Sequence, residues 1–453
     1  MTFIELFSSF TDYILFITCI FILVSSIYLT IKFRFIQIRF LPALIKMLIS
    51  AFKKKNKEGE HTIAPTKALF TAMSTTLGIS TIVGPVIAIH SGGPGALLGY
   101  LLTAFFGSAA IYAEVNLGIK HRKQLESGVI MGGPMQYIKH LLSPFAAKWY
   151  ALCCLLLMTV WSGAQANQLV ATFDSPLLGD YRVSTFISGA IISILIFACL
   201  IGGIKRVAAL SAKFVPVMFL LYLSSCLWII GLNIDKLAEI MNLVIKSAFE
   251  PYAMATGSLV GGLMSALRWG IMKGTQTSEA GVGTQSIPHS MAETKDPDAQ
   301  AMLAMVSTYT SGIMSFMSGC VALITNTWQD PTHPLGMSMV AASFEMYFSS
   351  LGIVIITISA LLFAFGTILG NCYNGGQCLA YLTNNRGLTL YFFGSACIIF
   401  IGSVLEAKTV WSMIDIVMAF MVVPHLAALI LSTRKEHSKV AAADLQERLV
   451  AET

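Results

Sequence analysis

The chain has 453 residues, of which 56% are hydrophobic and 11% are charged, whereas an ordinary soluble domain carries about 25% charged residues. Apolar runs of about 20 residues recur without the alternation of a β-barrel, so the composition indicates an all-α, polytopic integral membrane protein. The formal net charge of +6 does not indicate a nucleic-acid partner, because the basic residues cluster beside the ends of the apolar runs.

Eleven apolar runs are long enough to cross the hydrocarbon core of a bilayer, which is about 30 Å thick. The first, 13–30, has no basic segment before it and no small-residue cleavage site after it, so we expect it to remain as a membrane anchor. The others are 68–90, 95–118, 149–171, 184–203, 208–231, 254–288, 299–325, 347–371, 388–405 and 410–431. The sequence therefore predicts about 11 transmembrane helices.

Basic residues between the runs predict the orientation. The connection after the first run contains eight Lys and Arg residues between positions 32 and 57, which places it in the cytoplasm and the N-terminus outside. Its segment 33–52 has the pattern of an amphipathic interfacial helix. With eleven spans every strongly basic connection lies on the cytoplasmic side, including the tail 433–453, which we expect to be a frayed helix.

After the N-terminal anchor and basic segment, 1–65, the ten remaining runs form a core at 66–432. It divides into two fives, about 66–231 and 254–432, and each five opens with a run that glycines interrupt. Because five is odd, the two halves must lie in opposite orientations. Corresponding interrupted helices in two halves are typical of a transporter with a five-plus-five inverted repeat and a ligand site between the repeats.

The first interrupted run combines hydroxyl groups with Gly78, Gly84 and Pro85. Unwinding near Gly78 would turn backbone N–H groups toward a carboxylate and carbonyl groups toward a cation. The predicted substrate-binding residues here are Gly78, Ser80 and Thr81, and Thr75 is a candidate cation ligand. Close packing of small residues is the alternative interpretation.

The second interrupted run contains Thr277, Ser278 and Gly281, which we expect to bind substrate. It also contains Lys273 and Glu279, and ionisable groups at this depth normally face a cavity and pair with another group. Glu279 would bind a cation, bind a substrate ammonium, or pair with Lys273 as a latch. We favour a hinge or latch role for both, since unwound backbone alone can coordinate substrate.

Three amides, Gln165, Asn167 and Gln168, lie in the middle of the fourth run. Buried amides need hydrogen-bond partners, and a zwitterionic substrate would supply one. Asn167 lies about 160° around the helix from Gln165, at about 100° per residue. We therefore assign Gln165 to the substrate and at least one other amide to helix packing.

Three further residues have weaker assignments. Glu114 lies near Lys120 and Arg122 at the end of its span, which favours a latch. Thr367 and Asn371 interrupt an apolar run and would complete a cation site with the first broken helix. The eight histidines show no metal-ligand spacing, and no nucleophile or nucleotide motif is present. We expect no cofactor and no metal beyond a transported cation.

Taken together, several motifs resemble the alanine or glycine:cation symporter family, a branch with the leucine-transporter type of fold. The matching segments are 33–39, 92–122, 132–138, 164–169, 202–208, 215–222, 278–294 and 361–382. The resemblance implies sodium- or proton-driven uptake of a small neutral amino acid, typically alanine or glycine, across the inner membrane of a prokaryote.

The chain departs from the family pattern close to the expected site. Where the family usually has G-T-G-N-I, residues 78–82 read Gly-Ile-Ser-Thr-Ile, so Thr81 replaces an amide. The family's Ser-Asn-Glu-Ala-Gly becomes Thr-Ser-Glu-Ala-Gly at 277–281, and its preceding Arg-Gly becomes Lys273 and Gly274. Its Asp-Thr pair in the next span becomes Ser-Phe at 315–316, and its G-W-x-Y-Y-G-E segment loses both Trp and Glu at 370–376.

The sequence thus predicts a secondary active transporter, not an enzyme, that couples a cation, Na⁺ or H⁺, to a small neutral amino acid. A relative with another small substrate or with proton coupling is the alternative. The sequence has no repeated filter motif, which disfavours a channel. It has no nucleophile that would act with Glu279 and His289, which disfavours a membrane-embedded enzyme. We expect the lipid bilayer as the surroundings, no nucleic acid and no obligate protein partner.

Overall fold

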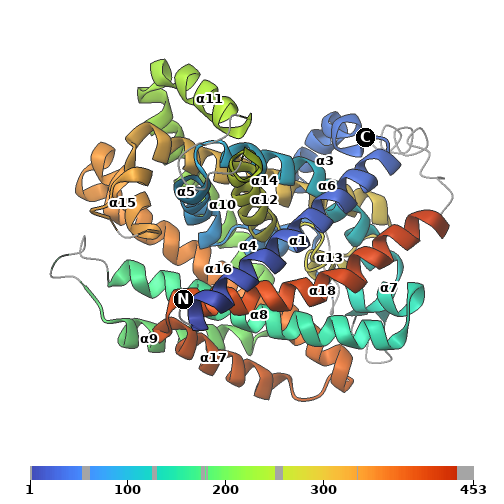
Figure 1. The fold of residues 1–453 in the computed structure, drawn as a ribbon. Coiled ribbons are helices and arrows are strands. Elements are labelled where there is room, and N and C mark those ends of the chain that lie inside the picture. The colour runs from blue at the N-terminus through green and yellow to red at the C-terminus, as the bar shows by residue number, and fades with distance from the viewer. Residues whose placement is uncertain are drawn as a thin grey trace.

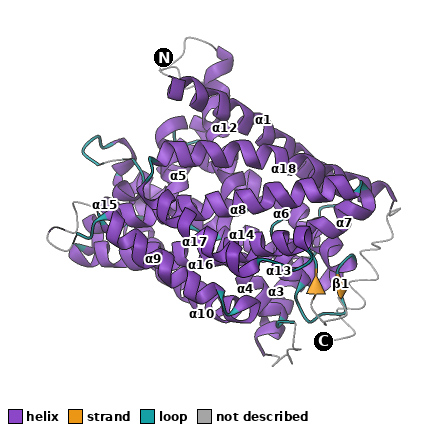
Figure 2. Cartoon of the chain, turned by 90° about the horizontal axis from the view of Figure 1, so that it is seen from below, coloured by secondary structure: helices purple, strands orange, loops and turns teal. Residues whose placement is uncertain are grey.

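The computed structural model describes residues 3–53, 62–124, 130–174, 179, 182–249, 259–333 and 335–435. These residues form an α-helical bundle with one two-stranded hairpin (Figures 1 and 2). The segment 250–258, which opens the second interrupted run, and the tail 436–453 lie outside the described residues.

The helices follow the predicted runs in chain order, with several short additions. They are α1 (Phe3–Lys32), α2 (Ile36–Arg39), α3 (Leu41–Lys53), α4 (Pro65–Thr76), α5 (Ile79–Gly92), α6 (Ala96–Lys120), α7 (Pro134–Leu141), α8 (Pro144–Phe173), α9 (Thr185–Leu200), α10 (Gly203–Leu232), α11 (Ile234–Phe249), α12 (Leu259–Ser278), α13 (Ser286–Ser290), α14 (Pro297–Thr325), α15 (Met337–Phe348), α16 (Ser350–Thr383), α17 (Leu388–Val404) and α18 (Ala407–Lys435). The hairpin pairs β1 (Lys123–Gln124) with β2 (Ile130–Met131).

Seven helices of the described chain are long and apolar enough to cross a membrane, and α9 and α17 are shorter apolar helices. The multi-pass architecture is therefore confirmed, whereas the count of eleven spans stays a prediction. The sequence did not predict α11 or α15.

Local sequence explains where several helices begin. The hydroxyl of Ser143 accepts a hydrogen bond from the Ala146 N–H at 3.1 Å and caps α8. Asp296 caps α14 by accepting from Asp298 and Ala299. In both helices a proline follows the cap, where its missing N–H costs nothing.

The end predicted for the ninth run at Asn371 is wrong, because α16 continues to Thr383 through Gly375 and Gly376. A Cβ at Gly376 would lie 3.0 Å from the Phe392 ring of α17, and Tyr391 covers Gly375 in the same way. The two glycines therefore admit aromatic side chains against the helix instead of ending it.

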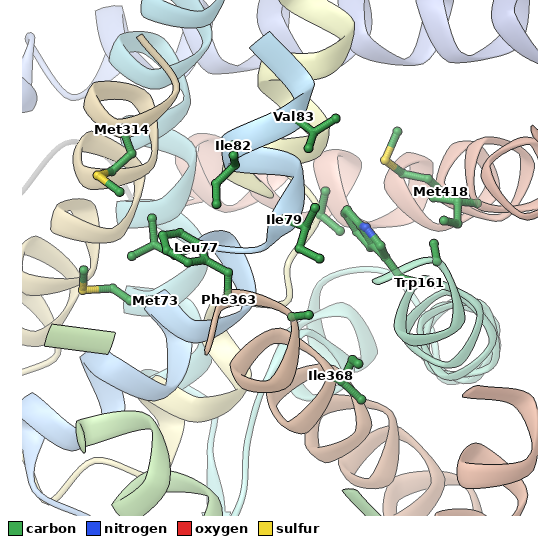
Figure 3. Close-up of a cluster of buried hydrophobic side chains, with 14 of the residues drawn as sticks. Met73, Leu77, Ile79, Ile82, Val83, Trp161, Met314, Phe363, Ile368 and Met418 are labelled. Carbon is green, nitrogen blue, oxygen red and sulfur yellow. The ribbon is translucent and has the colours of Figure 1, made fainter. Parts of the chain in front are cut away.

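The helices pack in two groups. α6 contacts α1, α12 and α14, while α8 contacts α16, α17 and α18. The interrupted pair α4 and α5 lies between the groups and contacts α12, α14, α10 and α16. Buried apolar side chains of several helices, including Leu77, Ile82, Met314 and Phe363, surround the interruption (Figure 3).

Gly99 of α6 and Gly270 of α12 bring two backbones into direct contact. A Cβ on Gly99 would lie 2.7 Å from the Gly270 Cα, so no side chain fits there. We expect Gly99→Val to lower the free energy of unfolding by about 1–3 kcal/mol, the usual cost of overpacking. Thermal unfolding of the purified protein measures this.

The matched control is Gly394→Val in α17, where a Cβ would meet no atom within 4 Å. It should leave the unfolding temperature nearly unchanged. Equal effects of the two substitutions would contradict the close crossing of α6 and α12.

Candidate functional site

The first interrupted helix breaks at Leu77 and Gly78, between α4 and α5. Gly78 has extended backbone, so the carbonyl groups at the end of α4 lose their helical partners. Side chains replace those partners. The Thr81 hydroxyl donates to the Thr76 carbonyl at 3.0 Å, and the Thr367 hydroxyl donates to the Ser74 carbonyl at 2.8 Å.

Gln165 of α8 completes the other side of this break. Its Oε1 atom accepts a hydrogen bond from the Ile79 N–H at 3.0 Å, at the first residue of α5. The amide thus caps the helix at its positive end.

The second interrupted helix breaks between α12 and α13, over residues 279–285. Glu279, Gly281 and Gly283 all have positive φ, at 53°, 77° and 99°. A left-handed conformation is unfavourable for a glutamate, so its neighbours must hold it in place. Tyr150 donates to the Val282 carbonyl at 2.9 Å, and His425 Nδ1 donates to the Gly281 carbonyl at 2.8 Å.

The two breaks touch through polar side chains. The Glu279 carboxylate is 1% exposed, accepts a hydrogen bond from Thr284, and lies 3.3 Å from the Thr75 hydroxyl of α4. Gln285 donates to the Ala72 carbonyl at 3.3 Å and to the Thr75 hydroxyl at 3.2 Å. Glu279 and Gln285 therefore join the second break to the last turn of α4.

A cavity of about 360 Å³ lies beside the first break, between α5, α8, α12 and α18. It is lined by Ile79, Ser80, Val83, Gly84, Ile87, Ser91, Gln165, Gln168, Trp269, Lys273, Gln276, Thr277, Leu335, Trp411 and Asp415. Of the predicted site residues, Ser80, Gln165, Thr277 and Lys273 line this cavity. Gly78, Thr81, Ser278 and Gly281 do not line it. Gly78 and Gly281 lie in the breaks, and Thr81 and Ser278 lie in the helical turns that flank them.

A hydrogen-bonded pair of polar residues in the cavity wall was absent from the sequence prediction. Gln276 of α12 donates through Nε2 to Asp415 Oδ1 of α18 at 2.6 Å. Lys273 donates to Gln276 Oε1 at 3.1 Å, and its Nζ lies 5.3 Å from the centre of the Trp411 ring. Lys273 and Glu279, both described, are not joined by an ion pair. An ionisable residue within an apolar run was the available signal for Asp415.

The candidate cation ligands lie where α16 meets the end of α4. Thr367 reaches the Ser74 carbonyl, as described above, and a Cβ on Gly370 would lie 3.0 Å from the Ser74 hydroxyl. Asn371 is 1% exposed, and neither atom of its amide has a hydrogen-bond partner among the described residues. Among all the residues that the structure describes, no group of three His, Cys, Asp or Glu side chains has the arrangement of a metal site.

Glu114 lies away from Arg122, its expected neighbour. Its carboxylate is fully buried, 3.8 Å from His425 Nε2, and faces the backbone of the second break. Arg122 instead donates to three backbone carbonyls, including that of Ala292 at 2.7 Å. Asn167 donates to the Gly402 and Leu405 carbonyls, so it packs α8 against the end of α17.

Comparison with known proteins gives consistent results. The model of the sodium:alanine symporter family matches residues 1–447. An uncharacterized transporter of Haemophilus influenzae is 34% identical over 90% of this chain and 88% of its own length. The sodium/alanine symporter AgcS of Methanococcus maripaludis is 31% identical over 90% of this chain and 89% of its own length.

Among solved structures, MhsT in complex with L-phenylalanine superimposes with a TM-score of 0.58 at 13% identity. The match covers 83% of this chain and 90% of MhsT. The predicted leucine-transporter type of fold is confirmed.

Gly281 tests the geometry of the second break. A Cβ there would lie 3.0 Å from Ile22 and 3.3 Å from Leu426, on a backbone with positive φ. We expect Gly281→Leu to insert into the membrane normally and to lower the free energy of unfolding by about 2–5 kcal/mol, from left-handed strain and overpacking together. Thermal unfolding of membrane-extracted protein measures this.

Gly203→Leu is the matched control, because Gly203 also has a positive φ, 64°, but a Cβ there would meet nothing within 4 Å. It carries the strain without the overpacking. A loss of stability at Gly203 as large as that at Gly281 would contradict the tight packing of the break.

Proposed function

The chain belongs to the sodium:alanine symporter family, is a multi-pass membrane transporter and not an enzyme, and we propose that it couples sodium to the uptake of a small neutral amino acid. Alanine and glycine are the proposed substrates. The AgcS relative carries the name of a sodium/alanine symporter, which supports this substrate class.

The observation that carries the proposal is the cavity beside the start of α5. Ile79 and Ser80, in the first turn of that helix, line the cavity together with Gln165. A helix N-terminus favours negative charge through its unpaired N–H groups and its dipole. The carboxylate of an amino acid fits this end, and Thr277 on the opposite wall offers a hydroxyl. We assign Gly78, Thr81, Ser278 and Gly281 the role of shaping the broken backbone around the substrate.

The proposed sodium site uses the carbonyls that the first break frees. Ser74 O and Leu77 O lie 2.8 Å and 3.5 Å from the Thr367 hydroxyl, and all three are oxygen atoms of the kind that hard cations prefer. Thr75 and Asn371 stay candidate ligands beside them.

Proton coupling is the second candidate, and one observation favours it. His425 and Glu114 are buried together at 3.8 Å, and His425 holds the second break through Gly281. Such a pair accepts a proton without a cation site. We assign Glu279 and Lys273 hinge or latch roles in the conformational change, and Glu114 the role of a latch.

We further propose residence in the cell (inner) membrane with the N-terminus outside and the C-terminus in the cytoplasm. The core 66–432 is proposed to contain two inverted repeats, with α4 and α5 opening the first and α12 and α13 opening the second. In this orientation the cavity lies on the outer side of the first break, because its lining follows α5 from Ile79 to Ser91.

Transport in proteoliposomes tests the function. We expect purified wild-type protein to accumulate radiolabelled alanine when an inward sodium gradient is imposed, and to lose most of this uptake when choline replaces sodium. Thr367→Val, which removes one proposed ligand without changing side-chain volume much, should raise the sodium concentration for half-maximal uptake about tenfold, equivalent to about 1.4 kcal/mol.

Ser359→Ala in α16 is the matched control, since its buried hydroxyl lies two turns from Thr367. Alanine uptake driven by a proton gradient alone would show that the proton, and not sodium, is the coupling ion. No counterflow of alanine, glycine or close analogues under either gradient would reject the amino-acid function.

Gln165 and Asn167 separate binding from packing within one helix. We expect Gln165→Ala to raise the alanine concentration for half-maximal uptake about tenfold, equivalent to about 1.4 kcal/mol, because it removes the amide that lines the cavity beside the start of α5. Asn167→Ala should lower the unfolding temperature and leave that concentration unchanged. Equal loss of abundance and affinity in Gln165→Ala would favour a packing role.

A further inference from the structure

Glu114 places a carboxyl group beside the second break without a hydrogen-bond partner. Its side chain is 0% exposed, and neither of its oxygen atoms accepts a hydrogen bond within the described part of the chain. The group faces the backbone N–H groups of Gly283, Gln285 and Ser286. A buried carboxylate in a membrane protein is costly unless a positive charge or a proton neutralises it. Glu114 therefore needs one of the two.

Among the described residues, the only cation within ion-pair distance of Glu114 would be a protonated His425. The Nε2 atom of His425 lies 3.8 Å from the carboxyl group. The charged group that acts on Glu114 from the break is Glu279, a second carboxylate. The other titratable groups beside the pair are the hydroxyls of Tyr137 on α7 and Tyr150 on α8, which carry no charge at neutral pH. The neutralising proton must therefore lie on His425 or on Glu114 itself.

The other helices that pack on α6 bring no further charge to Glu114 within the described residues. Asp298 of α14 bonds Tyr112, which lies two residues before Glu114 and so about 200° around the helix. Lys273 of α12 donates to an amide of its own helix at 3.1 Å, in the cavity wall. His289 of α13 turns its Nδ1 atom to the side chain of an α14 glutamine at 2.7 Å.

The hydrogen bonds of His425 leave no proton for Glu114. The Gly281 carbonyl can only accept, so the Nδ1 atom, 2.8 Å away, carries a hydrogen. The Nε2 atom lies 2.7 Å from the Tyr137 hydroxyl, much closer than to Glu114. A neutral imidazole accepts the Tyr137 O–H at this nitrogen, and both of its bonds are then made. A second N–H on the ring would point to Tyr137, which places the neutralising proton on Glu114.

The pair reaches solvent at the end of the molecule away from the cavity. Neither Glu114 nor His425 lines the cavity. The ring of Tyr137 lies 6.5 Å from that of His121, and the His121 ring lies 5.6 Å from that of His140, measured between ring centres. His140 is exposed. A proton can therefore exchange at this end without passing through the substrate cavity.

We propose that Glu114 binds one proton and is a neutral carboxylic acid in this arrangement of the second break, with His425 and Tyr137 as positioning residues. This proton is resident in the protein and distinct from the coupling ion, so it acts together with sodium. Its loss would set two carboxylates, Glu114 and Glu279, against the same break, and the new charge would attract the N–H groups of residues 283 and 285. The protonated form therefore favours the observed break. The consequence for uptake rests on the proposed function.

Infrared spectroscopy tests the proton directly, because a carboxylic acid and a carboxylate absorb at different frequencies. Purified full-length protein is measured at neutral pH. We expect Glu114→Gln, which keeps the size of the side chain but has no acid proton, to lose one carboxylic-acid band of the wild-type spectrum. Retention of every such band would show that Glu114 is ionised and would overturn the proposal.

Asp330→Asn is the matched control. Asp330 lies in the loop before α15, and hydrogen bonds from the Thr332 hydroxyl and N–H lower the pKa of its carboxyl group. The group is ionised at neutral pH, so this substitution should remove no acid band. Glu114→Asp decides the question if Glu114→Gln is not recovered as folded protein. It should move the acid band, and an unmoved band would count against Glu114 as its source.

The pH dependence of uptake tests the effect of the proton on the break. With the same pH on both sides of the proteoliposomes, sodium-driven alanine uptake by wild-type protein should fall at alkaline pH by about tenfold per pH unit, as for the loss of one proton. Glu114→Gln cannot ionise at this position and should lose that dependence. Identical pH profiles of the two proteins would refute a role of the proton in the break.

The outcomes separate this proposal from the proposed function. A pH indicator inside the proteoliposomes should report no proton entry with alanine, and entry of a proton would make it the coupling ion and end its resident role. If wild-type protein takes up no amino acid, the proposed function fails. The infrared spectrum then still decides whether Glu114 holds a proton.

Discussion

The contact between the two helix breaks is the constraint on which the site depends. Glu279 and Gln285, in the second break, reach Thr75 and the Ala72 carbonyl at the end of α4. Non-helical backbone at membrane depth persists only where its polar groups find partners inside the protein. Each break therefore supplies part of what the other needs. A movement of α12 and α13 relative to α4 would have to exchange these bonds, so we propose that Glu279 is a positioning residue at this joint.

Much of the architecture could be predicted from the sequence because it follows from local physical chemistry. Run length and hydropathy predicted the long helices, and the hydroxyl-rich stretch with Gly78 and Pro85 predicted the first break. The second break followed from Gly281 and Gly283, both of which adopt positive φ. The predicted end of the ninth run at Asn371 was wrong. The helix continues through Gly375 and Gly376, and the aromatic side chains that pack on these glycines come from a different helix, α17.

The candidate site was predicted only in part, because its walls come from helices that are far apart in the chain. Ser80, Gln165, Thr277 and Lys273 were identified by polarity within apolar runs and do line the cavity. Asp415 of α18 accepts a hydrogen bond from another helix, α12. Its partner Gln276 is 139 residues earlier in the sequence, so the pair exists only after packing. Glu114 was matched to nearby Arg122 by proximity in sequence, whereas tertiary packing places it beside His425.

Coupling requires that the cation and the amino acid favour the same conformation. The proposed cation ligand Thr367 bonds the carbonyls before the first break, and the cavity begins with the N–H groups after it, so one two-residue interruption faces both ligands. A cation that binds one arrangement of this backbone ten times more tightly shifts the equilibrium by about 1.4 kcal/mol, and by reciprocity the amino acid strengthens cation binding by the same amount. In the proposed mechanism the contact through Glu279 would carry that shift to the second break, where His425 and Tyr150 hold the backbone from α18 and α8. Because those helices also carry Asp415 and Gln165, the proposed mechanism would make the cavity walls and the break respond to the ligands together.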